Sequence, residues 1–494
     1  MSATQKFYKA DFNSTLFPLK TNLLMVENHE EEISKYIYQC ILDEAKSADN
    51  FLAQQRVYAT KPRGHLRRTV KLDPVAEYYI YDVIYRNRPI FKGAVSDARI
   101  SFGYRFQGGA PVPIHAAFRE YTQCAKRHTQ TYQHSLHFDI ASYFNSVYHH
   151  DIVNWFASKD GVTQKDQEAL GKFFREINSG RSVDFLPHGI YPCKMIGNEF
   201  LKFIDLSGIL KSSVIVRFMD DFCLFDNSET VIQQDFVRIQ QLLGNKGLNI
   251  NPSKTFVDKN ATDVKETITG ISRSLKQIIK ETKSVPTESG VELVELEWEV
   301  ERKLSADQVN ALLSLLKDET LEEGDADLIL SFLRTHSDSV LGHFPSLLQR
   351  FPNITKHIYS VCSGIADKQG LVKVVLDHLN SGAYLLEYQL FWLGMIAEDY
   401  LPGVHGYGDL LIRLYELTAD YKIARAKILE IPEQGFGLKE IRGEYLKTGQ
   451  SDWLSWASAI GSRTLKVAER NYMLDYFSKG SPLNFLVASC AKKL

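Results

Sequence analysis

The sequence predicts an α+β region followed by an all-α region. Residues 1–285 alternate between strand-like and helix-like segments, whereas apolar residues recur at helical spacing from about residue 305 onward. With 494 residues, 44% of them hydrophobic and 24% charged, the chain is long enough for two or more globular domains. The acidic stretch 285–304 contains Pro and Gly and is the best candidate boundary. We therefore expect one domain at 1–290 and a second at 291–494.

Two strand signals stand out in the first region. SLHFDI (135–140) is a short apolar segment, and VIVRFMDDFCLF (214–225) has the pattern of an apolar β-hairpin. Helix-like segments accompany them, and His149 and His150 are expected to begin the helix after the first strand. In the second region short amphipathic segments are separated by Gly, Asn, Asp or Pro, which predicts a stack of short helices without strands. A helical solenoid is compatible with this pattern, although no repeat period is visible.

Charge is distributed unevenly along the chain. The formal net charge is −2, but residues 1–290 hold 37 Lys and Arg against 32 Asp and Glu, and the remainder holds 21 against 28. A contact with nucleic acid therefore belongs more naturally to the first region, and its electrostatic contribution should be modest. No run approaches the ~18 apolar residues of a membrane span, and the N-terminus lacks the pattern of a secretory signal. The six cysteines are scattered, which argues against disulfides or a zinc site and favours a reducing cytoplasm.

Three aspartates are the most informative residues. Asp220 and Asp221 lie at the tip of the expected hairpin, among apolar residues where bare carboxylates are costly to bury. Asp139 ends the other apolar strand. An isolated Asp pair is usually a solvated turn, and an isolated Asp after a strand is usually a helix N-cap. Two strands that bring three carboxylates together can instead hold two divalent cations, for which Mg²⁺ has the right ligand preference.

Over roughly residues 54–275 the chain resembles reverse transcriptases, because several motifs occur in the order of that family. FDIASYFNSV (138–147) resembles the first catalytic motif, RFMDDF (217–222) the Tyr-x-Asp-Asp motif, and GLNINPSKTFV (247–257) the palm motif that follows. TITGIS (267–272) is a weak match to the motif that grips the primer. The resemblance implies a right-hand polymerase fold with fingers and palm. It implies Asp139, Asp220 and Asp221 as catalytic residues, and these three with Ile140 as the metal-binding residues for two Mg²⁺ ions, with Mn²⁺ as a possible substitute.

The resemblance also implies the contacts to a deoxynucleoside triphosphate. KPRGHLRRTVKL (61–72) resembles the fingers pattern Lys-x-x-Gly-x-x-Arg, and ISFGYRFQGG (100–109) a segment whose Arg105 either contacts nucleic acid or braces the fingers. Phe144 occupies the sugar-sensing position, where a bulky ring would clash with a ribose 2′-hydroxyl. A basic loop is otherwise solvated, and a Phe is otherwise ordinary core packing. The nucleotide-binding residues implied by the matches are Lys61, Arg67, Phe144, Gly189 and Lys254.

LPHGIYPCKMIGNEFL (186–201) departs from the family pattern. Gly189 and Asn198 fit, but His188 stands where Gln is usual, and Cys193-Lys194 where Ser-Pro is usual. Because this segment normally packs near the template, its departure weakens the case for ordinary templated copying.

The helix-rich, acidic second region makes the architecture similar to the abortive-infection reverse transcriptases of bacterial anti-phage defence. In that group an α-helical HEAT-like repeat domain follows fingers and palm in place of a normal thumb. The resemblance implies template-independent DNA synthesis, single-stranded DNA attached covalently to a tyrosine, a homo-oligomer (trimer or hexamer) and a cytoplasmic, bacterial or prophage-encoded protein. Tyr8 is our candidate priming residue, because it lies in a short polar N-terminal stretch expected to be mobile. Its alternative role is to pin the N-terminus to the fingers.

Two other readings remain open at this stage. One is a templated, retron-like enzyme that uses a dedicated RNA, although such enzymes generally have the Ser-Pro segment and a more basic thumb. The other is a non-catalytic scaffold that binds nucleic acid or protein through the helical region. A scaffold has no physical need for three carboxylates in apolar strands, which favours the polymerase.

Overall fold

The computed structural model describes residues 1–43, 49–61, 64–91, 93, 95–181, 183–255, 276–287, 290–301 and 304–494. The chain forms two compact units. One comprises Met1–Ala59, Leu66–Lys259 and Thr418–Leu494, and the other comprises Thr60–His65 and Asn260–Leu417. None of the described helices has the length and apolar character needed to cross a membrane.

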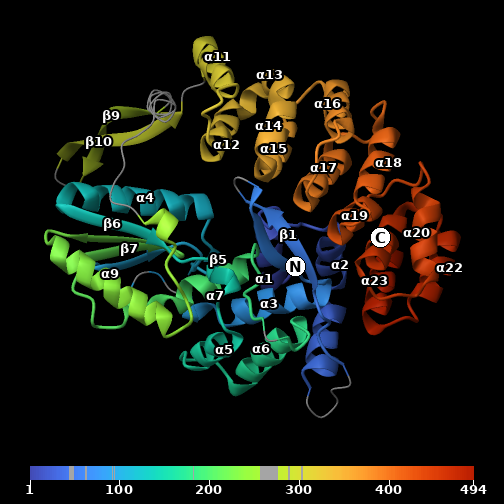
Figure 1. Cartoon of the computed structure of the whole chain (residues 1–494), viewed down its shortest axis with the longest axis horizontal. Coiled ribbons are helices and arrows are strands. Elements are labelled where there is room, and N and C mark those ends of the chain that lie inside the picture. Colours follow the sequence, from blue (N-terminus) through green and yellow to red (C-terminus); the bar gives the residue numbers. More distant parts are fainter. Residues whose placement is uncertain are drawn as a thin grey trace. The chain divides into compact units, whose positions relative to one another are not determined.

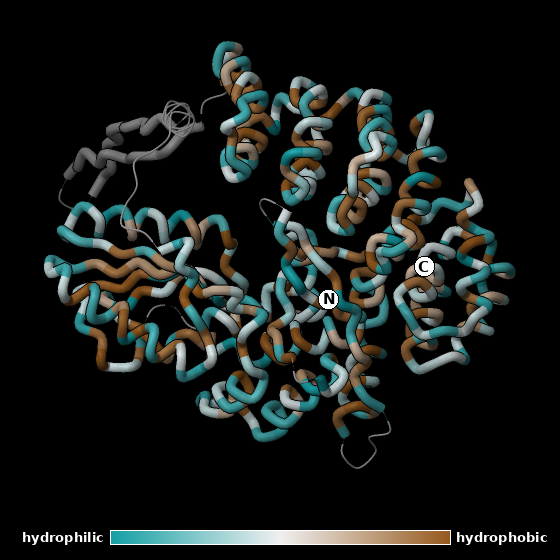
Figure 2. Tube along the Cα trace, viewed as in Figure 1, coloured by the Kyte–Doolittle hydropathy of each residue, from teal (hydrophilic) through white to brown (hydrophobic). Residues whose placement is uncertain are grey.

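A four-stranded sheet is the centre of the first unit, with strand order β3-β7-β8-β6. It consists of β3 (Arg99–Phe102), β6 (His134–Asp139), β7 (Val214–Phe218) and β8 (Asp221–Asp226). The expected strand and hairpin are thus confirmed. β7 and β8 are antiparallel neighbours, β6 pairs with β8, and β3 runs parallel to β7. Figure 2 shows hydrophobic residues along these strands, as expected for a sheet covered on both faces.

Helices α4 (Ile114–Thr131) and α9 (Glu229–Gly244) cover opposite faces of this sheet (Figure 1). Cys124 of α4 packs with Val216 and Cys223 on one face. On the other face Phe138 stacks on Phe222 and meets Phe236 of α9 edge-on. Successive residues of a strand point to opposite faces of the sheet, so the neighbours Phe222 and Cys223 of β8 contact α9-side and α4-side residues respectively.

The remaining helices of this unit precede, interrupt and follow the sheet. α5 begins at His149, which confirms that expectation. Their bounds, with those of the short strands, are α1 Ala3–Phe12, α2 Lys20–Tyr36, β1 Gln55–Thr60, β2 Leu66–Lys71, α3 Pro74–Arg86, β4 Phe106–Gln107, β5 Ala110–Pro111, α5 His149–Ala157, α6 Gln164–Ile177, α7 Tyr191–Phe200, α8 Lys202–Asp205, α19 Lys422–Glu430, α20 Leu438–Lys447, α21 Trp453–Gly461, α22 Val467–Phe477 and α23 Pro482–Lys493.

The second unit joins a β-hairpin to a series of helices. α15 packs on α17, and α17 packs on α18. The elements are β9 Lys276–Thr287, β10 Gly290–Glu301, α11 Ala306–Leu315, α12 Glu323–Phe332, α13 Ser337–Val340, α14 Phe344–Arg350, α15 Thr355–Cys362, α16 Lys368–Asn380, α17 Glu387–Tyr400 and α18 Tyr407–Leu417. Every regular element described from residue 304 onward is helical, as expected; a HEAT-like repeat stays a prediction.

The stretch expected to be a domain boundary, 285–304, is mostly strand. β10 spans Gly290–Glu301 and pairs in antiparallel register with β9. The sequence GVELVELEWEVE alternates between acidic and apolar residues, which is the period of a strand and a signal that outweighs the nearby Pro and Gly. A division into domains at residue 290 stays a prediction, and the compact units group the chain differently, since 418–494 joins the unit that holds the N-terminus.

Candidate active site

The sheet brings the predicted carboxylates to one end. Asp139 is the last residue of β6 and lies opposite Asp221, the first residue of β8, in the antiparallel register. Asp220 occupies the β7–β8 turn beside Met219, whose φ of 58° is in the left-handed region. The N–H of Ile140 donates to the Asp220 carbonyl at 3.3 Å. The backbone therefore fixes the predicted catalytic residues next to one another.

Mutual repulsion and burial set the protonation of these carboxyl groups. Burial, followed by the charge of Asp221, raises the pKa of Asp220 to about 6. Desolvation also raises the pKa of Asp221, against the lowering effect of Lys254. Asp139 Oδ1 is buried and has no hydrogen-bond partner among the described residues. The charge of Asp139 contributes to the raised pKa values of Asp220 and Asp221, so the three carboxyl groups form a local excess of negative charge, which a cation would relieve.

Lys254 supplies positive charge at this end of the sheet. Its Nζ lies 2.7 Å from Asp139 Oδ2. Burial lowers the pKa of Lys254, but the hydrogen bond and charge of Asp139 outweigh that effect and raise it. The N–H of Asn251 donates to the Asp139 carbonyl at 2.9 Å, so the backbone also ties the 249–254 segment to the end of β6.

A divalent cation fits the donor chemistry of this site, but not every detail of its arrangement. Carboxylate and backbone carbonyl oxygens are suitable ligands for Mg²⁺, and Asp139 Oδ1 is a buried acceptor in need of a partner. However, no group of three or more His, Cys, Asp or Glu among the described residues is placed to hold an ion as it stands. Lys254 lies against Asp139 instead, so it would have to share that carboxylate with a bound ion.

Phe144 and Gly189 lie close to the segment that follows Asp139. The ring of Phe144 is 7% exposed and meets His188 edge-on, with 4.4 Å between ring centroids. The Leu186 N–H donates to the Phe144 carbonyl at 2.7 Å. Gly189 has a φ of 105°, which favours glycine. The structure thus brings Phe144 to the 186–190 turn, while its sugar-sensing role stays a prediction.

Strand β2 contacts this same region. Arg68 Nε donates to Asn145 Oδ1 at 3.3 Å, and Thr69 Oγ1 exchanges hydrogen bonds of 2.9 Å with the backbone carbonyl and N–H of His188. Arg67 precedes them in β2. Lys61 belongs to the hairpin tip, Thr60–His65, in the other compact unit, so its contact with a triphosphate stays a prediction, as does that of Arg67.

Leu16 is a residue of this region that the sequence did not single out. A Cβ built on Gly189 would lie 2.5 Å from Leu16 Cγ. The loop between α1 and α2 therefore covers the turn that departs from the family pattern. Arg105 pairs with Glu120 of α4 at 3.3 Å, and both of its predicted roles, contact with nucleic acid and bracing of the fingers, stay predictions. TITGIS (267–272) lies outside the described residues.

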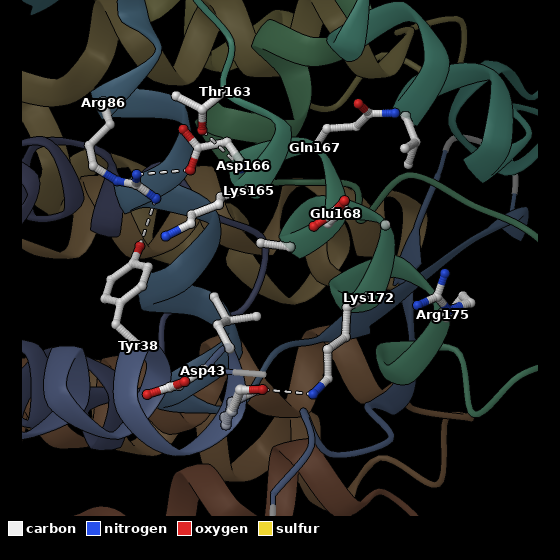
Figure 3. Close-up of a pocket in the computed structure, with 15 residues that line it drawn as sticks. Tyr38, Asp43, Arg86, Thr163, Lys165, Asp166, Gln167, Glu168, Lys172 and Arg175 are labelled. Atoms are coloured by element: carbon white, nitrogen blue, oxygen red, sulfur yellow. Dashed lines mark hydrogen bonds and ion pairs between the residues drawn. The ribbon is translucent and has the colours of Figure 1, made fainter. Parts of the chain in front are cut away.

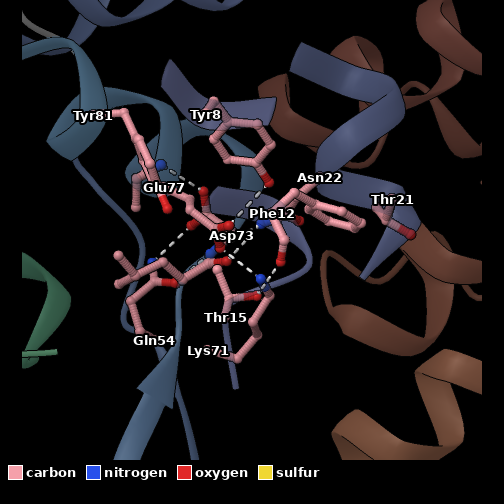
Figure 4. Close-up of polar contacts among 12 residues, drawn as sticks. Tyr8, Phe12, Thr15, Thr21, Asn22, Gln54, Lys71, Asp73, Glu77 and Tyr81 are labelled. Atoms are coloured by element: carbon pink, nitrogen blue, oxygen red, sulfur yellow. Dashed lines mark hydrogen bonds and ion pairs between the residues drawn. The ribbon is translucent and has the colours of Figure 1, made fainter. Parts of the chain in front are cut away.

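Tyr8 does not lie in a mobile stretch, and that expectation is wrong. It belongs to helix α1, is 1% exposed, and donates its hydroxyl to Glu77 Oε1 at 2.9 Å (Figure 4). Asn22 and Lys71 also donate to Glu77, and burial together with Glu77 raises the pKa of Tyr8. Polar residues of α1 donate to buried carboxylates, as Thr4 does to Asp82 and Tyr8 to Glu77. The polar composition of the N-terminal stretch therefore does not make it exposed. In this arrangement the Tyr8 hydroxyl pins α1 to α3 and is not accessible as a primer.

A polar surface hollow of about 1100 Å³ lies elsewhere in the first unit, between the end of α2 and α6 (Figure 3). Its walls carry both signs of charge, with Arg86 bonded to Asp166 at 2.9 Å and Lys172 bonded to the carbonyl of Ile41 at 2.7 Å. Asp139, Asp220 and Asp221 are not among its lining residues. The candidate active site is therefore defined by its carboxylates rather than by this hollow.

Comparisons with known proteins identify one domain. The profile of the family described as reverse transcriptase (RNA-dependent DNA polymerase) matches residues 101–265. No curated protein matches the chain. Among solved structures, a telomerase chain from Candida albicans, solved with the TWJ fragment of telomeric RNA, is 12% identical over 80% of this chain and 68% of that one. Its TM-score of 0.27 is too low to support an argument about fold. The match at 101–265 contains all three carboxylates, and this part of the chain is a reverse transcriptase domain.

Proposed function

We propose that the protein is a DNA polymerase that adds deoxynucleotides without a template and attaches the product covalently to one of its own tyrosines. The observation that carries the polymerase assignment is the meeting of Asp139, Asp220 and Asp221 at one end of the sheet within a reverse transcriptase domain. A non-catalytic scaffold would gain nothing from two carboxyl groups, Asp220 and Asp221, whose pKa values are raised by burial and by neighbouring negative charge.

The aspartates and the backbone carbonyl of Ile140 are the groups that would hold two Mg²⁺ ions. When bound, such ions activate an attacking hydroxyl and stabilise the leaving pyrophosphate. Lys254, already beside Asp139, would neutralise charge on the triphosphate, together with Lys61 and Arg67. Phe144 would exclude a ribose 2′-hydroxyl, which makes deoxynucleotides the substrate.

Occupation of the 186–190 turn supports synthesis without a template. In the family this segment packs near the template, but here Leu16 fills the space over Gly189, and Thr69 takes both the N–H and the carbonyl of His188. A template base that approached this turn would have to displace Leu16. The modest basic excess of residues 1–290 is in keeping with weak binding of a duplex.

The primer would be a tyrosine other than Tyr8. Exposed candidates among the described residues are Tyr58, Tyr148, Tyr384, Tyr472 and Tyr476. By resemblance we further propose a homo-oligomer, a trimer or hexamer, and a role in abortive-infection defence against phage. Light scattering of the purified protein measures the first. Plating of phage on cells that carry the wild type or an Asp220→Asn/Asp221→Asn variant measures the second.

The decisive experiment incubates purified protein with Mg²⁺ and labelled deoxynucleotides, without template or primer. Products are separated on a denaturing gel before and after proteinase digestion, and mass spectrometry locates the modified tyrosine. Label that travels with the protein, shifts on proteolysis and disappears in Asp220→Asn/Asp221→Asn supports the proposal. Asp226→Asn changes a carboxylate at the far end of the same strand and should keep the label.

Incorporation that appears only with an added RNA and primer would favour the templated reading instead. Leu16→Ala sharpens this comparison, because it removes the side chain that covers Gly189. We expect Leu16→Ala to gain dependence on, or stimulation by, an added template. Incorporation by neither protein under any condition would favour the scaffold.

A further inference from the structure

We propose that Gly197 and Asn198 of α7 form a brace, which holds the segment that carries Asp139 in register with the segment that carries Asp220. Arg217 and Tyr143 are the positioning residues that bind this brace. The inference rests on the proposed metal-dependent polymerase function. It concerns residues that contact neither the predicted nucleotide nor the predicted ions, and that act through the backbone beside Asp139 and Asp220.

Arg217 joins α7 to the β7–β8 turn. Its side chain is fully buried, and Nε donates to Asp205 Oδ2 at 2.9 Å. Nη1 donates to Asn198 Oδ1 at 2.9 Å and to the Met219 carbonyl at 3.3 Å, while Nη2 donates to the Asn198 carbonyl at 2.9 Å. One planar guanidinium thus binds the end of α7, the short helix α8 and the residue just before Asp220.

The location of the Met219 bond explains why a buried charge is used here. Met219 has a φ of 58°, a left-handed conformation that is strained for a non-glycine residue. The Met219 carbonyl is the backbone acceptor directly before the Asp220–Asp221 pair in the chain. Burying an arginine is costly unless it is paired and hydrogen-bonded, and Asp205 and Asn198 meet that requirement. The guanidinium therefore holds a strained turn that a neutral side chain of similar size would leave unbonded.

Tyr143 joins α7 to the other carboxylate-bearing segment. It lies four residues after Asp139, is 2% exposed, and donates its hydroxyl to the Gly197 carbonyl at 2.7 Å. A Cβ on Gly197 would lie 3.1 Å from the Tyr143 ring and 3.4 Å from the Phe144 ring. Glycine at 197 thus allows this close approach, and the neighbouring Asn198 receives Arg217 from the opposite segment.

Adjacent residues of one helix therefore bind both sides of the site. A shift of either segment would move Asp139 relative to Asp220, and metal ligands must be held to within about 0.5 Å of their working geometry. Groups that orient metal ligands from behind typically change metal affinity or activity by 10- to 100-fold when they are removed. The brace predicts a defect in metal binding that exceeds any loss of stability.

The test is a Mn²⁺ titration of the full-length protein, followed by loss of the free-ion electron paramagnetic resonance signal, with thermal unfolding midpoints measured in parallel. Arg217→Lys keeps the positive charge opposite Asp205 but loses the guanidinium that bonds Asn198 and Met219. Tyr143→Phe removes the hydroxyl that bonds the Gly197 carbonyl. The matched controls are Arg442→Lys, a buried arginine that bonds backbone carbonyls of the C-terminal helices, and Tyr81→Phe, a buried tyrosine that donates to Asp11. Mn²⁺ binding that the wild type shows and the Asp220→Asn/Asp221→Asn variant lacks is assigned to the carboxylate site.

We expect the Mn²⁺ dissociation constant to rise about tenfold in Arg217→Lys and by a smaller factor in Tyr143→Phe, with both controls within twofold of the wild type. Arg217→Lys and Tyr143→Phe that bind Mn²⁺ like the wild type would overturn the brace. If Arg217→Lys does not fold, Tyr143→Phe alone decides. Wild-type protein without aspartate-dependent Mn²⁺ binding would instead overturn the proposed metal centre, and the brace with it.

Discussion

Replacing Glu430 with Gln tests how the C-terminal helices hold the N-terminal ones. Glu430 ends α19, and its carboxylate accepts the N–H groups of Lys20 and Thr21 at 2.9 and 2.8 Å and the Thr21 hydroxyl at 3.0 Å. It also pairs with Lys427 at 2.8 Å, and both side chains are fully buried. The N-cap residue of α2, Leu19, supplies no side-chain bond, so a carboxylate more than 400 positions away in sequence caps this helix.

The expected cost follows from these contacts. Removing one charge of a buried ion pair costs about 3–5 kcal/mol, and a lost N-cap costs about 1 kcal/mol. Glutamine keeps the shape and one acceptor oxygen, so we expect a cost of about 3 kcal/mol, less than the sum of these two losses. Because 1.4 kcal/mol is a factor of ten, local opening of the first turn of α2 should become roughly 100-fold more frequent.

Hydrogen–deuterium exchange of the peptide that contains Lys20 and Thr21 measures this opening directly. Glu433→Gln is the matched control, because Glu433 lies three residues further along the same segment and its carboxylate accepts the loop N–H of Gly435. The double variant Lys427→Met/Glu430→Gln removes both charges and should recover part of the protection. Unchanged exchange of the α2 peptide in Glu430→Gln, with the control also unchanged, would refute the reasoning.

Four further predictions concern single side chains. Tyr8→Phe should leave the covalent DNA–protein product intact on a gel, and it should lower stability by about 1–3 kcal/mol because Glu77 loses a buried donor. Lys254→Met should lower kcat for incorporation about 100-fold, measured at saturating nucleotide, because a cation beside Asp139 is lost. Phe144→Ala should admit ribonucleotides, seen as a reduced preference for dNTP over NTP in competition assays. Burial lowers the pKa of His149, so the neutral imidazole is favoured in the folded protein. The resulting stabilisation is complete above pH ~6.5, the ordinary pKa of His, and is lost as pH falls through the lowered pKa. His149→Gln should therefore flatten the decline of the thermal unfolding midpoint over this pH range.

The parts that the sequence predicted correctly are those with a local pattern. The strands that end at Asp139 and surround Asp220–Asp221 are short apolar segments with charges at their ends, and pairing them places the carboxylates together. The start of α5 at His149 and the helices after residue 304 also follow from local periodicity. β10 has the same kind of signal in its alternating Glu and apolar residues, although the nearby Pro and Gly are residues typical of a boundary.

The errors and omissions involve contacts between distant parts of the chain. Tyr8 meets Glu77 and Thr21 meets Glu430, and nothing in the neighbourhood of either residue indicates its partner. Arg217 stands close in sequence to Asp220 and Asp221, whereas its ion-pair partner in the fold is Asp205. A polar side chain can be buried only if hydrogen-bond or ion-pair partners offset the cost of removing it from water, and the tertiary structure determines which residues those partners are.

The 186–190 turn shows how far a departure from a family pattern can be interpreted. The substitutions at His188 and Cys193 indicated that the usual surface for a template had changed, but they did not show what replaced it. In the structure Leu16 covers Gly189, and Thr69 bonds both backbone groups of His188, and the proposal of synthesis without a template rests on these contacts. Loss of a template-binding surface alone would leave the turn open to solvent or to any nucleic acid. In the proposed function, strand β2 and the loop between α1 and α2 engage both the backbone and the surface of this turn and would exclude a base by competition, and that competition is what Leu16→Ala is designed to relax.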